Sequence, residues 1–323
     1  MVYIAGKQDC EKNHRGERGD DLLLCVSRDG AVTDVVQLLI SGAAIGCIYA
    51  LIALGFVLIY KATEVVNFAQ GDVMMLAAFV AFSFATLLEL GFWASLPLAI
   101  AVMAGFGAVF DRVLLRPIIG MPTFSAVMIT LAAGFAMRGI ASMIPGWGTD
   151  THSFKAPWSD EVIRMGAVIV STDHLAILVV TALLCIGLYL FFKGTRIGIA
   201  MQAASQNQLA AYYMGIPVRS INTLIWAIAA AVAALAAVLL APITFVHNNM
   251  GFIGIKAFPA AVVGGFGSIP GAFVGGLIIG WVEAFAGFYL PEGFKDVAAY
   301  VVVLLVLMVR PSGIFGQMRR KKV

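Results

Sequence analysis

Charged side chains are scarce in this sequence, and their scarcity excludes an ordinary soluble domain. Asp, Glu, Lys and Arg together make up 12% of the 323 residues, whereas 61% are hydrophobic; about 25% charged residues is typical of soluble domains. Several apolar runs reach the roughly 20 residues that a helix needs to cross a bilayer core. These runs lack the polar face that recurs every turn in a helix at the surface of a soluble protein. The sequence therefore predicts an all-α, polytopic helical membrane protein.

Residues typical of metal sites and catalysis are also few. The four cysteines, at positions 10, 25, 47 and 185, share no metal-ligand spacing, and the four histidines are scattered along the chain. The sequence contains no Walker A, G-x-S-x-G or H-E-x-x-H motif, and no clustered pair of carboxylates on a soluble loop. We therefore expect no catalytic residue, no metal and no cofactor in this chain, so that a partner must supply any energy.

The first 33 residues differ from the rest of the chain. Nine charged residues crowd the stretch from Lys7 to Asp21, with little apolar surface to bury, and this composition predicts a disordered extension over 1–33. The stretch lacks the basic start, apolar run and small-residue cleavage site of a secretory signal peptide. We expect the membrane domain to occupy 34–317 and a basic cytoplasmic tail to occupy 318–323.

The apolar segments and the basic residues together predict a topology. The 194–220 segment, with Lys193, Arg196 and Arg219 in or beside it, and the 318–323 tail hold the densest Lys and Arg, so both should be cytoplasmic. The long 145–172 loop has few basic residues and should lie outside. We predict membrane segments at 35–60, 74–88, 96–110, 123–144, 173–192, 221–246, 251–271, 272–290 and 297–309.

The 251–271 segment must cross the membrane if both basic segments are cytoplasmic. It is short and is interrupted by Pro259, Gly264, Gly265 and Pro270, so we expect a broken or re-entrant helix. Irregular backbone at membrane depth is tolerated only beside protein or a water-filled cavity. We therefore expect eight or nine crossings in all, with Gly264 and Gly265 beside a translocation pathway.

A second interrupted segment, 61–76, lies in the N-terminal half. It carries Asn67, Gln70 and Asp72 close together, and a short interrupted segment in each half is the pattern expected at a transport site. Helix capping at a span boundary is an equal alternative for these three residues. Glu283 lies within an apolar span, where a charge is costly, so it should face the bundle or a cavity.

The 194–220 segment is a polar island of small residues between two long apolar runs. The spacing of Ala200, Ala204, Asn207 and Ala211 predicts one helical face. Gly215, with a proline two residues later, predicts the end of that helix. We expect a short helix outside the membrane whose small-residue face docks into a groove of another protein, although packing on its own domain is the ordinary alternative.

Four sequence blocks resemble the permease subunits of branched-chain amino acid ABC importers. The resemblance covers about residues 34–317. It implies a bacterial inner-membrane permease that pairs with a second permease, by preference a different chain, with two cytoplasmic ATPase subunits that use ATP, and with a periplasmic substrate-binding protein. The blocks are VVNFAQGDVMMLAAF (65–79), TRIGIAMQAASQNQLAAYYMGI (195–216), FPAAVVGGFGSIPGAFVGGLIIGWVEAF (258–285) and MVRPSGIFG (308–316).

The resemblance also assigns a role to the 194–220 segment. Residues 199–215 match the part that carries the family's short cytoplasmic helix, which docks on the ATPase. The family usually has charged residues there, whereas Asn207 stands at an Asp-like place in this chain, which puts one charge contact in doubt. The residues expected to couple the permease to the ATPase are Arg196, Gly198, Ala200, Ala203, Ala204, Asn207, Ala211 and Gly215.

Other functions remain open from the sequence. Permeases for urea, short amides and sugars look similar. An ion-coupled secondary transporter or channel would need several ionisable residues within the membrane, and this chain offers essentially Glu283 alone. A purely structural scaffold would not need the Gly- and Pro-broken segments. We favour alternating access driven by ATP hydrolysis in the partner subunits.

Overall fold

The structure of the chain is a computed structural model that describes residues 19–118, 122–159, 161–165, 168–291 and 293–316, without the side chains of residues 19–32, Thr123, Met165 and Val168. The described part is mostly helical, as the sequence predicts, and its strands β1 (Val162–Met165) and β2 (Val168–Ser171) form an antiparallel hairpin. Its α-helices are α1 (Gly19–Thr63), α2 (Gln70–Phe82), α3 (Phe92–Phe110), α4 (Thr123–Met143), α5 (Thr172–Gly194), α6 (Arg196–Gln206), α7 (Gln208–Tyr213), α8 (Val218–Thr244), α9 (Phe252–Gly264), α10 (Ile269–Tyr289) and α11 (Phe294–Val309). Short π- or 3₁₀-helical segments are η1 (Ser83–Leu87), η2 (Asp111–Leu115), η3 (Arg116–Ile118) and η4 (Asn248–Gly251).

Seven of the described helical segments are long and apolar enough to cross a membrane. They contain α1, α2, α3, α4, α5, α8 and α10, so the polytopic all-α class is confirmed. The predicted 251–271 segment is interrupted: α9 ends at Gly264, Gly265 turns the chain with φ +95°, and α10 begins at Ile269. With 13 and 16 residues, α9 and α11 are shorter than these seven segments.

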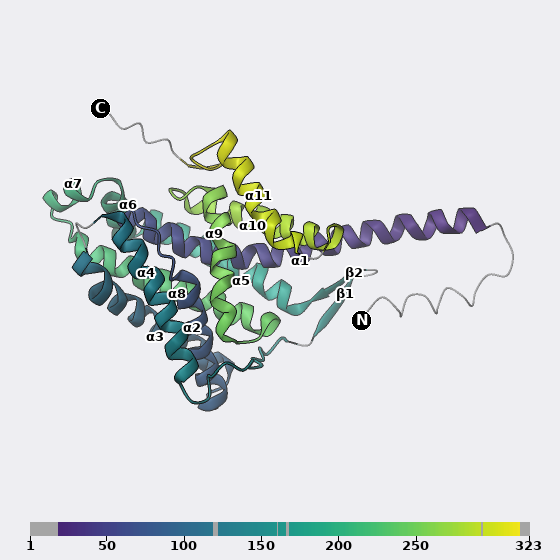
Figure 1. Cartoon of the computed structure of the whole chain (residues 1–323), viewed down its shortest axis with the longest axis horizontal. Helices are drawn as coiled ribbons and strands as arrows, with labels where there is room; N and C mark the ends of the chain where they lie inside the picture. Colours follow the sequence, from purple (N-terminus) through teal and green to yellow (C-terminus); the bar gives the residue numbers. More distant parts are fainter. Residues whose placement is uncertain (1–18, 119–121, 160, 166–167, 292, 317–323) are drawn as a thin grey trace.

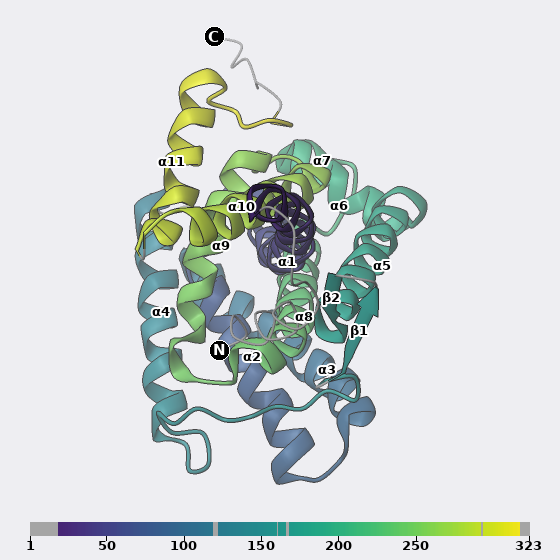
Figure 2. The same ribbon diagram turned by 90° about the vertical axis from the view of Figure 1, so that its right-hand side faces the viewer.

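Helix α1 forms the centre of the bundle. Its span is 89% buried, whereas the spans of α4 and α5 are 28% and 22% buried, and Figure 2 shows α1 nearly end-on between α5 on one side and α4 and α11 on the other. Gly46 of α1 lies against the backbone of Gly276 in α10, where a Cβ atom would come within 2.9 Å of the Gly276 carbonyl oxygen. The absence of side chains at these glycines lets α1 and α10 pack closely along their length.

The bundle has two distinct ends (Figure 1). The "α7 end" holds α6, α7 and the last turn of α1, since Gln208 Nε2 donates a hydrogen bond to the carbonyl of Ala62 at 2.5 Å. The "hairpin end" holds β1, β2 and the loop that follows α4. This loop is fixed to the end of α8 by reciprocal backbone hydrogen bonds between His152 and Val246 at 2.8 and 2.9 Å.

Helix α1 is longer than the sequence analysis predicts. It begins at Gly19, so it includes residues 19–33, which the sequence analysis assigned to the extension. Extending an existing helix adds one hydrogen bond for each residue fixed and avoids the cost of nucleation, which accounts for helix beyond the buried span. The predictions for residues 1–18 and for the 318–323 tail lie outside the described residues.

Candidate functional site

The chain between α1 and α2 lies inside the bundle. Asn67 and Gln70 are 0% and 1% exposed. Gln70 Nε2 donates to the backbone carbonyl of Ala229 in α8 at 3.3 Å, and Asn67 Nδ2 donates to Gln70 Oε1 at 3.2 Å. Asn67 Oδ1 accepts a hydrogen bond from the backbone N–H of Ala69, the N-cap residue of α2, at 3.1 Å. The two amides therefore join the start of α2 to α8 through satisfied hydrogen bonds.

Asp72 points away from these amides and pairs with Arg138 of α4. Arg138 Nε donates to Asp72 Oδ1, and the two side chains are only 15% and 7% exposed. The Arg138 guanidinium also lies 3.8 Å from the ring centroid of Phe252 at the start of α9, a cation–π contact. Sequence reasoning did not pair Asp72 with Arg138, because the two residues are 66 positions apart.

Helix α2 crosses the η4–α9 junction at glycines. A Cβ atom on Gly71 would overlap the carbonyl oxygen of Gly251 and would lie 2.8 Å from the Cα atom of Gly254. The two backbones are in direct contact here. Because a backbone obstacle cannot rotate away as a side chain can, only glycine fits at this crossing. The contact places two interrupted segments of the chain side by side.

Glu283 of α10 is buried at the contact of α10 with α1 and α11. It is 4% exposed, accepts a 2.5 Å hydrogen bond from the hydroxyl of Tyr49, and lies 3.6 Å from Nζ of Lys295. A neighbouring ion pair joins Lys256 of α9 to Asp296 of α11 at 2.5 Å. Glu283 thus faces the bundle, as its position in an apolar span requires, and it belongs to a charged network that links four helices.

Gly264 and Gly265 lie at the α7 end, where α9 meets residues 310–316. The backbone N–H groups of Ile314 and Phe315 donate to the carbonyls of Val263 and Gly264 at 2.9 and 3.2 Å. The N–H of Gly265 donates to the carbonyls of Ala261 and Val262, so the last four carbonyls of α9, which a helix leaves without intrahelical partners, are all bonded. The structure therefore gives this glycine pair a role in a close backbone crossing.

The 194–220 segment is two helices, where we predicted one. Asn207 ends α6 with extended backbone (φ −154°, ψ 102°) and caps α7, because its Oδ1 accepts a hydrogen bond from the backbone N–H of Ala210 at 3.0 Å. Asparagine at an N-cap satisfies a donor that the helix leaves free. Gly215 follows α7 with φ +82°, which agrees with the predicted helix stop.

Part of the small-residue face of this segment packs on the bundle itself, the alternative that the sequence left open, whereas Asn207 of the same face is exposed. Ala204 and Ala211 are buried, and a Cβ atom on Gly198 would overlap the carbonyl oxygen of Phe191 at the end of α5. Small residues are needed here because the segment lies so close to its own helices. Of the other residues expected to couple, Ala200 and Ala203 are half-buried, and Arg196 and Gly215 are exposed.

The exposed side of α7 carries large apolar side chains instead. These side chains are 65–82% exposed, and the i, i+3 and i+4 spacing of the first three places them on one helical face. We call the set the α7 apolar surface. Scattered exposed apolar residues are normal, but a contiguous patch outside the membrane spans typically marks an interaction site. Sequence reasoning missed these residues because it assigned the small-residue face to the partner. The α7 apolar surface consists of Leu209 (65% exposed), Tyr212 (67%), Tyr213 (77%) and Met214 (82%).

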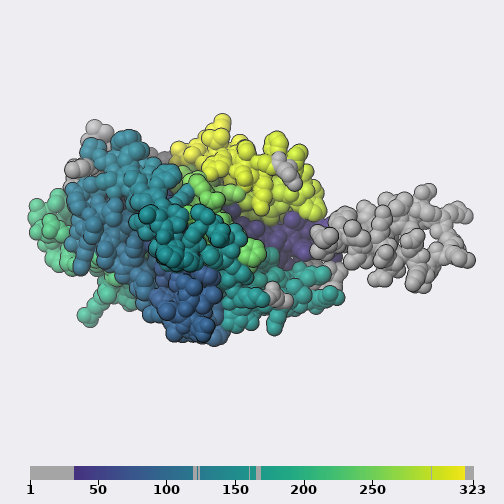
Figure 3. Space-filling model, turned by 60° about the horizontal axis from the view of Figure 1, so that its bottom comes forward, coloured from purple at the N-terminus to yellow at the C-terminus, as the bar shows by residue number. Residues whose placement is uncertain are grey.

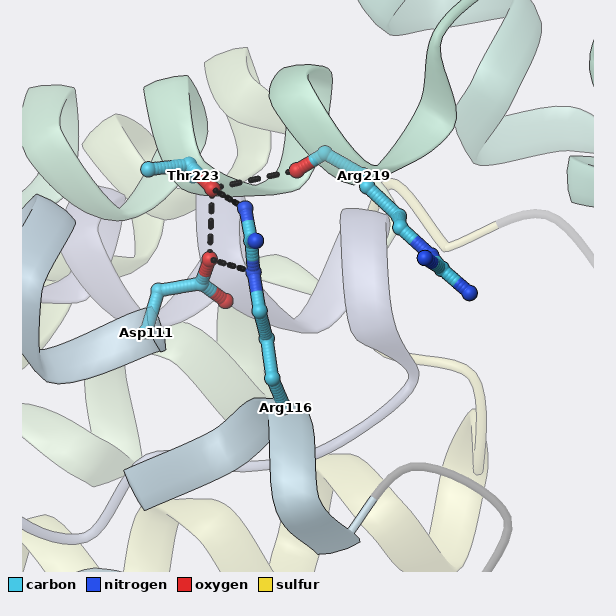
Figure 4. Close-up of polar contacts among 4 residues, drawn as sticks. All are labelled: Asp111, Arg116, Arg219 and Thr223. Carbon is cyan, nitrogen blue, oxygen red and sulfur yellow. Dashed lines mark hydrogen bonds and ion pairs between the residues drawn. The ribbon is translucent and has the colours of Figure 1, made fainter. Parts of the chain in front are cut away.

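A polar cluster fixes the start of α8 to the end of α3 (Figure 4). Arg116 Nη2 donates to Thr223 Oγ1 at 2.7 Å, and Thr223 Oγ1 lies 2.6 Å from Asp111 Oδ2 and 3.0 Å from the carbonyl oxygen of Arg219. Arg116 Nε lies 3.5 Å from Asp111 Oδ2. The sequence indicates Asp111 and Arg116 only as the polar end of a span. In the structure they hold α8 at the point where it leaves the 194–220 segment.

Comparisons with known proteins identify the family of this fold. Residues 38–309 match the family model described as "Branched-chain amino acid transport system / permease component". The chain is 37% identical to the "High-affinity branched-chain amino acid transport system permease protein BraD" of Pseudomonas aeruginosa over 310 residues, which cover 89% of this chain and 98% of BraD. It is 35% identical to the permease protein LivH of Escherichia coli K12, over 89% of this chain and 97% of LivH. A solved structure, "PsaBC from Streptococcus pneumoniae in complex with Fab", aligns with 87% of this chain at 17% identity and a TM-score of 0.47. The chain belongs to the family of branched-chain amino acid transport permeases.

Proposed function

We propose that this chain is the permease subunit of an ATP-driven importer for branched-chain amino acids in the bacterial inner membrane. The match to the family over residues 38–309 supports this function most strongly. In this proposal two cytoplasmic ATPase subunits supply the energy, a periplasmic binding protein delivers the amino acid, and a second, different permease chain completes the pathway. The chain itself hydrolyses nothing and moves substrate by alternating access.

The α7 apolar surface is the proposed ATPase contact. Its four side chains lie at the α7 end of the bundle, which the density of Lys and Arg assigns to the cytoplasm. Gln208 bonds to the end of α1, and Gln202 Nε2 of α6 donates to the carbonyl of Phe192 in α5 at 3.0 Å. A push on α7 is therefore transmitted to α1, and through α6 to α5. We propose that these attachments convert ATPase closure into helix movement.

Nine crossings are the topology that we propose. Helix α1 runs from the hairpin end, where Asp34 and Ile169 border the same cavity, to the α7 end, where Ala62 meets Gln208. Residues 310–316 lie on the cytoplasmic side if nine helices each cross the membrane once. These helices are α1, α2, α3, α4, α5, α8, α9, α10 and α11. The short helices α9 and α2 cross with the help of the irregular segments before them, which lie inside the bundle.

The face formed by α4, α9 and α11 is the proposed boundary of the pathway and the contact with the second permease. In Figure 3 the yellow surface of α11 lies next to the blue-to-teal surface of the N-terminal half. Arg138 and Lys256 lie on this side with 15% and 36% of their side chains exposed, and Asp296 is 60% exposed. Lipid solvates charged groups poorly, so such groups should face a partner or water. The pathway would then be bordered by Asp72, with Asn67 and Gln70 behind it, and by Glu283.

Reconstitution tests the proposed function. The chain is assembled in proteoliposomes with its ATPase subunits, second permease and binding protein, and uptake of labelled leucine, isoleucine and valine is measured. We expect uptake that needs ATP and the binding protein and that is unaffected by dissipating proton and sodium gradients. Stimulation by urea or a short amide alone would contradict the substrate, and uptake driven by an ion gradient without ATP would contradict the mechanism.

A variant of α7 tests the partner. Tyr213 is exposed, so Tyr213→Ala should fold normally, yet it should weaken ATPase binding about tenfold or more because an interface tyrosine contributes roughly 2 kcal/mol. Tyr289→Ala is the matched control, since Tyr289 is 64% exposed at the hairpin end. Equal ATPase binding by both variants would show that α7 is not the contact.

A further inference from the structure

A cavity of about 650 Å³ lies between α5 and α10 near the α7 end. Part of its wall is apolar and includes Ile186 of α5 and Phe273 and Val274 of α10. Helix α5 packs mainly on α1 and α6, so the cavity separates it from α10. In Figure 2, α5 lies across α1 from α4 and α11, so the cavity is on the opposite side of the bundle from the proposed permease contact. If the second permease occupies the proposed contact, this side faces the bilayer.

The end of the cavity nearest α7 is basic. Lys61, in the last turn of α1, and Lys193, in the last turn of α5, both border it, and none of the described residues that line it is Asp or Glu. Lys193 Nζ lies 3.3 Å from the hydroxyl of Tyr189, a neutral group. Among the residues that the structure describes, neither lysine forms a salt bridge with a carboxylate. Two positive charges therefore converge on the cavity without a carboxylate of the lining to neutralise them.

The two parts of the cavity match the two parts of a phospholipid. Ile186 precedes Lys193 by seven residues, which is roughly 10 Å along a helix. A ligand must therefore combine an anionic group at the level of the lysines with an apolar chain that runs into the bundle. A free phosphate or nucleotide would leave the apolar wall unoccupied, and an uncharged apolar chain would leave the lysines without an anion. Basic pockets between membrane helices on the cytoplasmic side typically bind anionic headgroups.

We propose that this cavity is a binding site for an anionic glycerophospholipid, with the phosphate between Lys61 and Lys193 and an acyl chain against Ile186, Phe273 and Val274. The lipid fills the gap between α5 and α10 and so stabilises the position of α5, the span that leads directly into α6. Zwitterionic lipids bind less well, because their headgroup brings a positive charge to two lysines. The proposal does not depend on the transported substrate.

Native mass spectrometry of the full-length chain tests the site. The chain is purified from nanodiscs that hold equal amounts of phosphatidylglycerol and phosphatidylcholine, and the lipid that remains bound is identified. We expect one tightly bound phosphatidylglycerol. The Lys61→Gln/Lys193→Gln variant should bind it about 25-fold more weakly, at roughly fivefold for each lysine near the membrane surface. Ile186→Trp, at a position 56% exposed and therefore tolerant of substitution, should also prevent binding because it fills the apolar part.

Arg112→Gln is the matched control, because Arg112 is an exposed cation just after α3 and does not border the cavity. It should leave lipid binding unchanged. Equal retention of the two lipids by the wild-type chain would overturn the proposal even if the double lysine variant fails to fold. An equal loss of lipid in Arg112→Gln would assign the binding to general surface attraction, and displacement of the lipid by millimolar inorganic phosphate would assign the lysines to a phosphate ion; either result would contradict a lipid site.

Discussion

The hydroxyl of Tyr49 in α1 donates a 2.5 Å hydrogen bond to Oε2 of Glu283 in α10, and both residues are only 4% exposed. The bond crosses the contact between α1 and α10, where glycines of the two helices meet. A carboxylate at this depth is tolerated because Tyr49 and Lys295 both contact it. The pair therefore determines which face of α10 can lie against α1.

Glu283→Ala should lower the free energy of unfolding by about 2 kcal/mol, because it leaves the buried Tyr49 hydroxyl without an acceptor. Combining it with Tyr49→Phe should recover part of that loss, since neither buried polar partner then remains. Thermal unfolding in detergent measures both effects. Glu161→Ala, at an exposed carboxylate next to β1, is the control. A Glu283→Ala midpoint equal to that of the control would show that the bond contributes nothing.

Removing one partner of the Asp72–Arg138 ion pair should be costlier than removing both. Asp72→Asn and Arg138→Gln should each lower the unfolding free energy by about 3 kcal/mol, because each leaves an uncompensated charge inside the bundle. The double variant should lose less than the sum of the two single variants. A double-mutant cycle on the thermal midpoints tests this coupling. Strict additivity would mean that the two charges are solvated independently.

Gly71→Ala should prevent α2 from packing on the η4–α9 junction, because the new methyl group meets backbone at Gly251 and Gly254. We expect a loss of about 3 kcal/mol or more, the upper end for an overpacked site. Gly105→Ala is the matched control, because a Cβ atom there meets open space within α3. That control should stabilise α3 by roughly 0.5–1 kcal/mol. Similar midpoints for the two variants would contradict the close crossing.

Two variants of Asn207 separate the contribution of the α7 helix cap to coupling from the contribution of a negative charge at this position. Asn207→Ala removes the cap of α7 and should cost about 1 kcal/mol of helix stability, which would reduce ATPase activity stimulated by the binding protein in the reconstituted transporter. Asn207→Asp keeps the cap and adds the charge that the family usually has nearby. It should retain or increase the stimulation. If Asn207→Ala and Asn207→Asp lowered it equally, the cap would not be the relevant feature.

The class of the protein and the place where the chain breaks could be predicted from the sequence, because both depend on local composition. Apolar length predicts the spans, and Gly265 provides the positive φ at the break after α9. The Gly215 stop was predictable for the same reason. These features need no knowledge of what packs against them.

The partners of the candidate residues were not predictable, because they come from distant parts of the chain. Helical spacing groups Ala204 and Ala211 but cannot say whether they face the bundle or a partner; in the structure both are buried. The break between α6 and α7 at Asn207 was also not predicted, since an asparagine is compatible with the middle of a short helix. The ion pair between Asp72 and Arg138 requires the fold before it can be recognised.

The hydrogen bonds that complete α9 have a consequence for the order of assembly during synthesis. The carbonyls of Val263 and Gly264 receive hydrogen bonds from the N–H groups of Ile314 and Phe315, which a ribosome adds about fifty residues later. During translation, α9 can enter the membrane, but its final turn stays open until the segment after α11 has emerged and folded back. A nascent chain stopped before Ile314 would leave these two carbonyls of α9 without their donors.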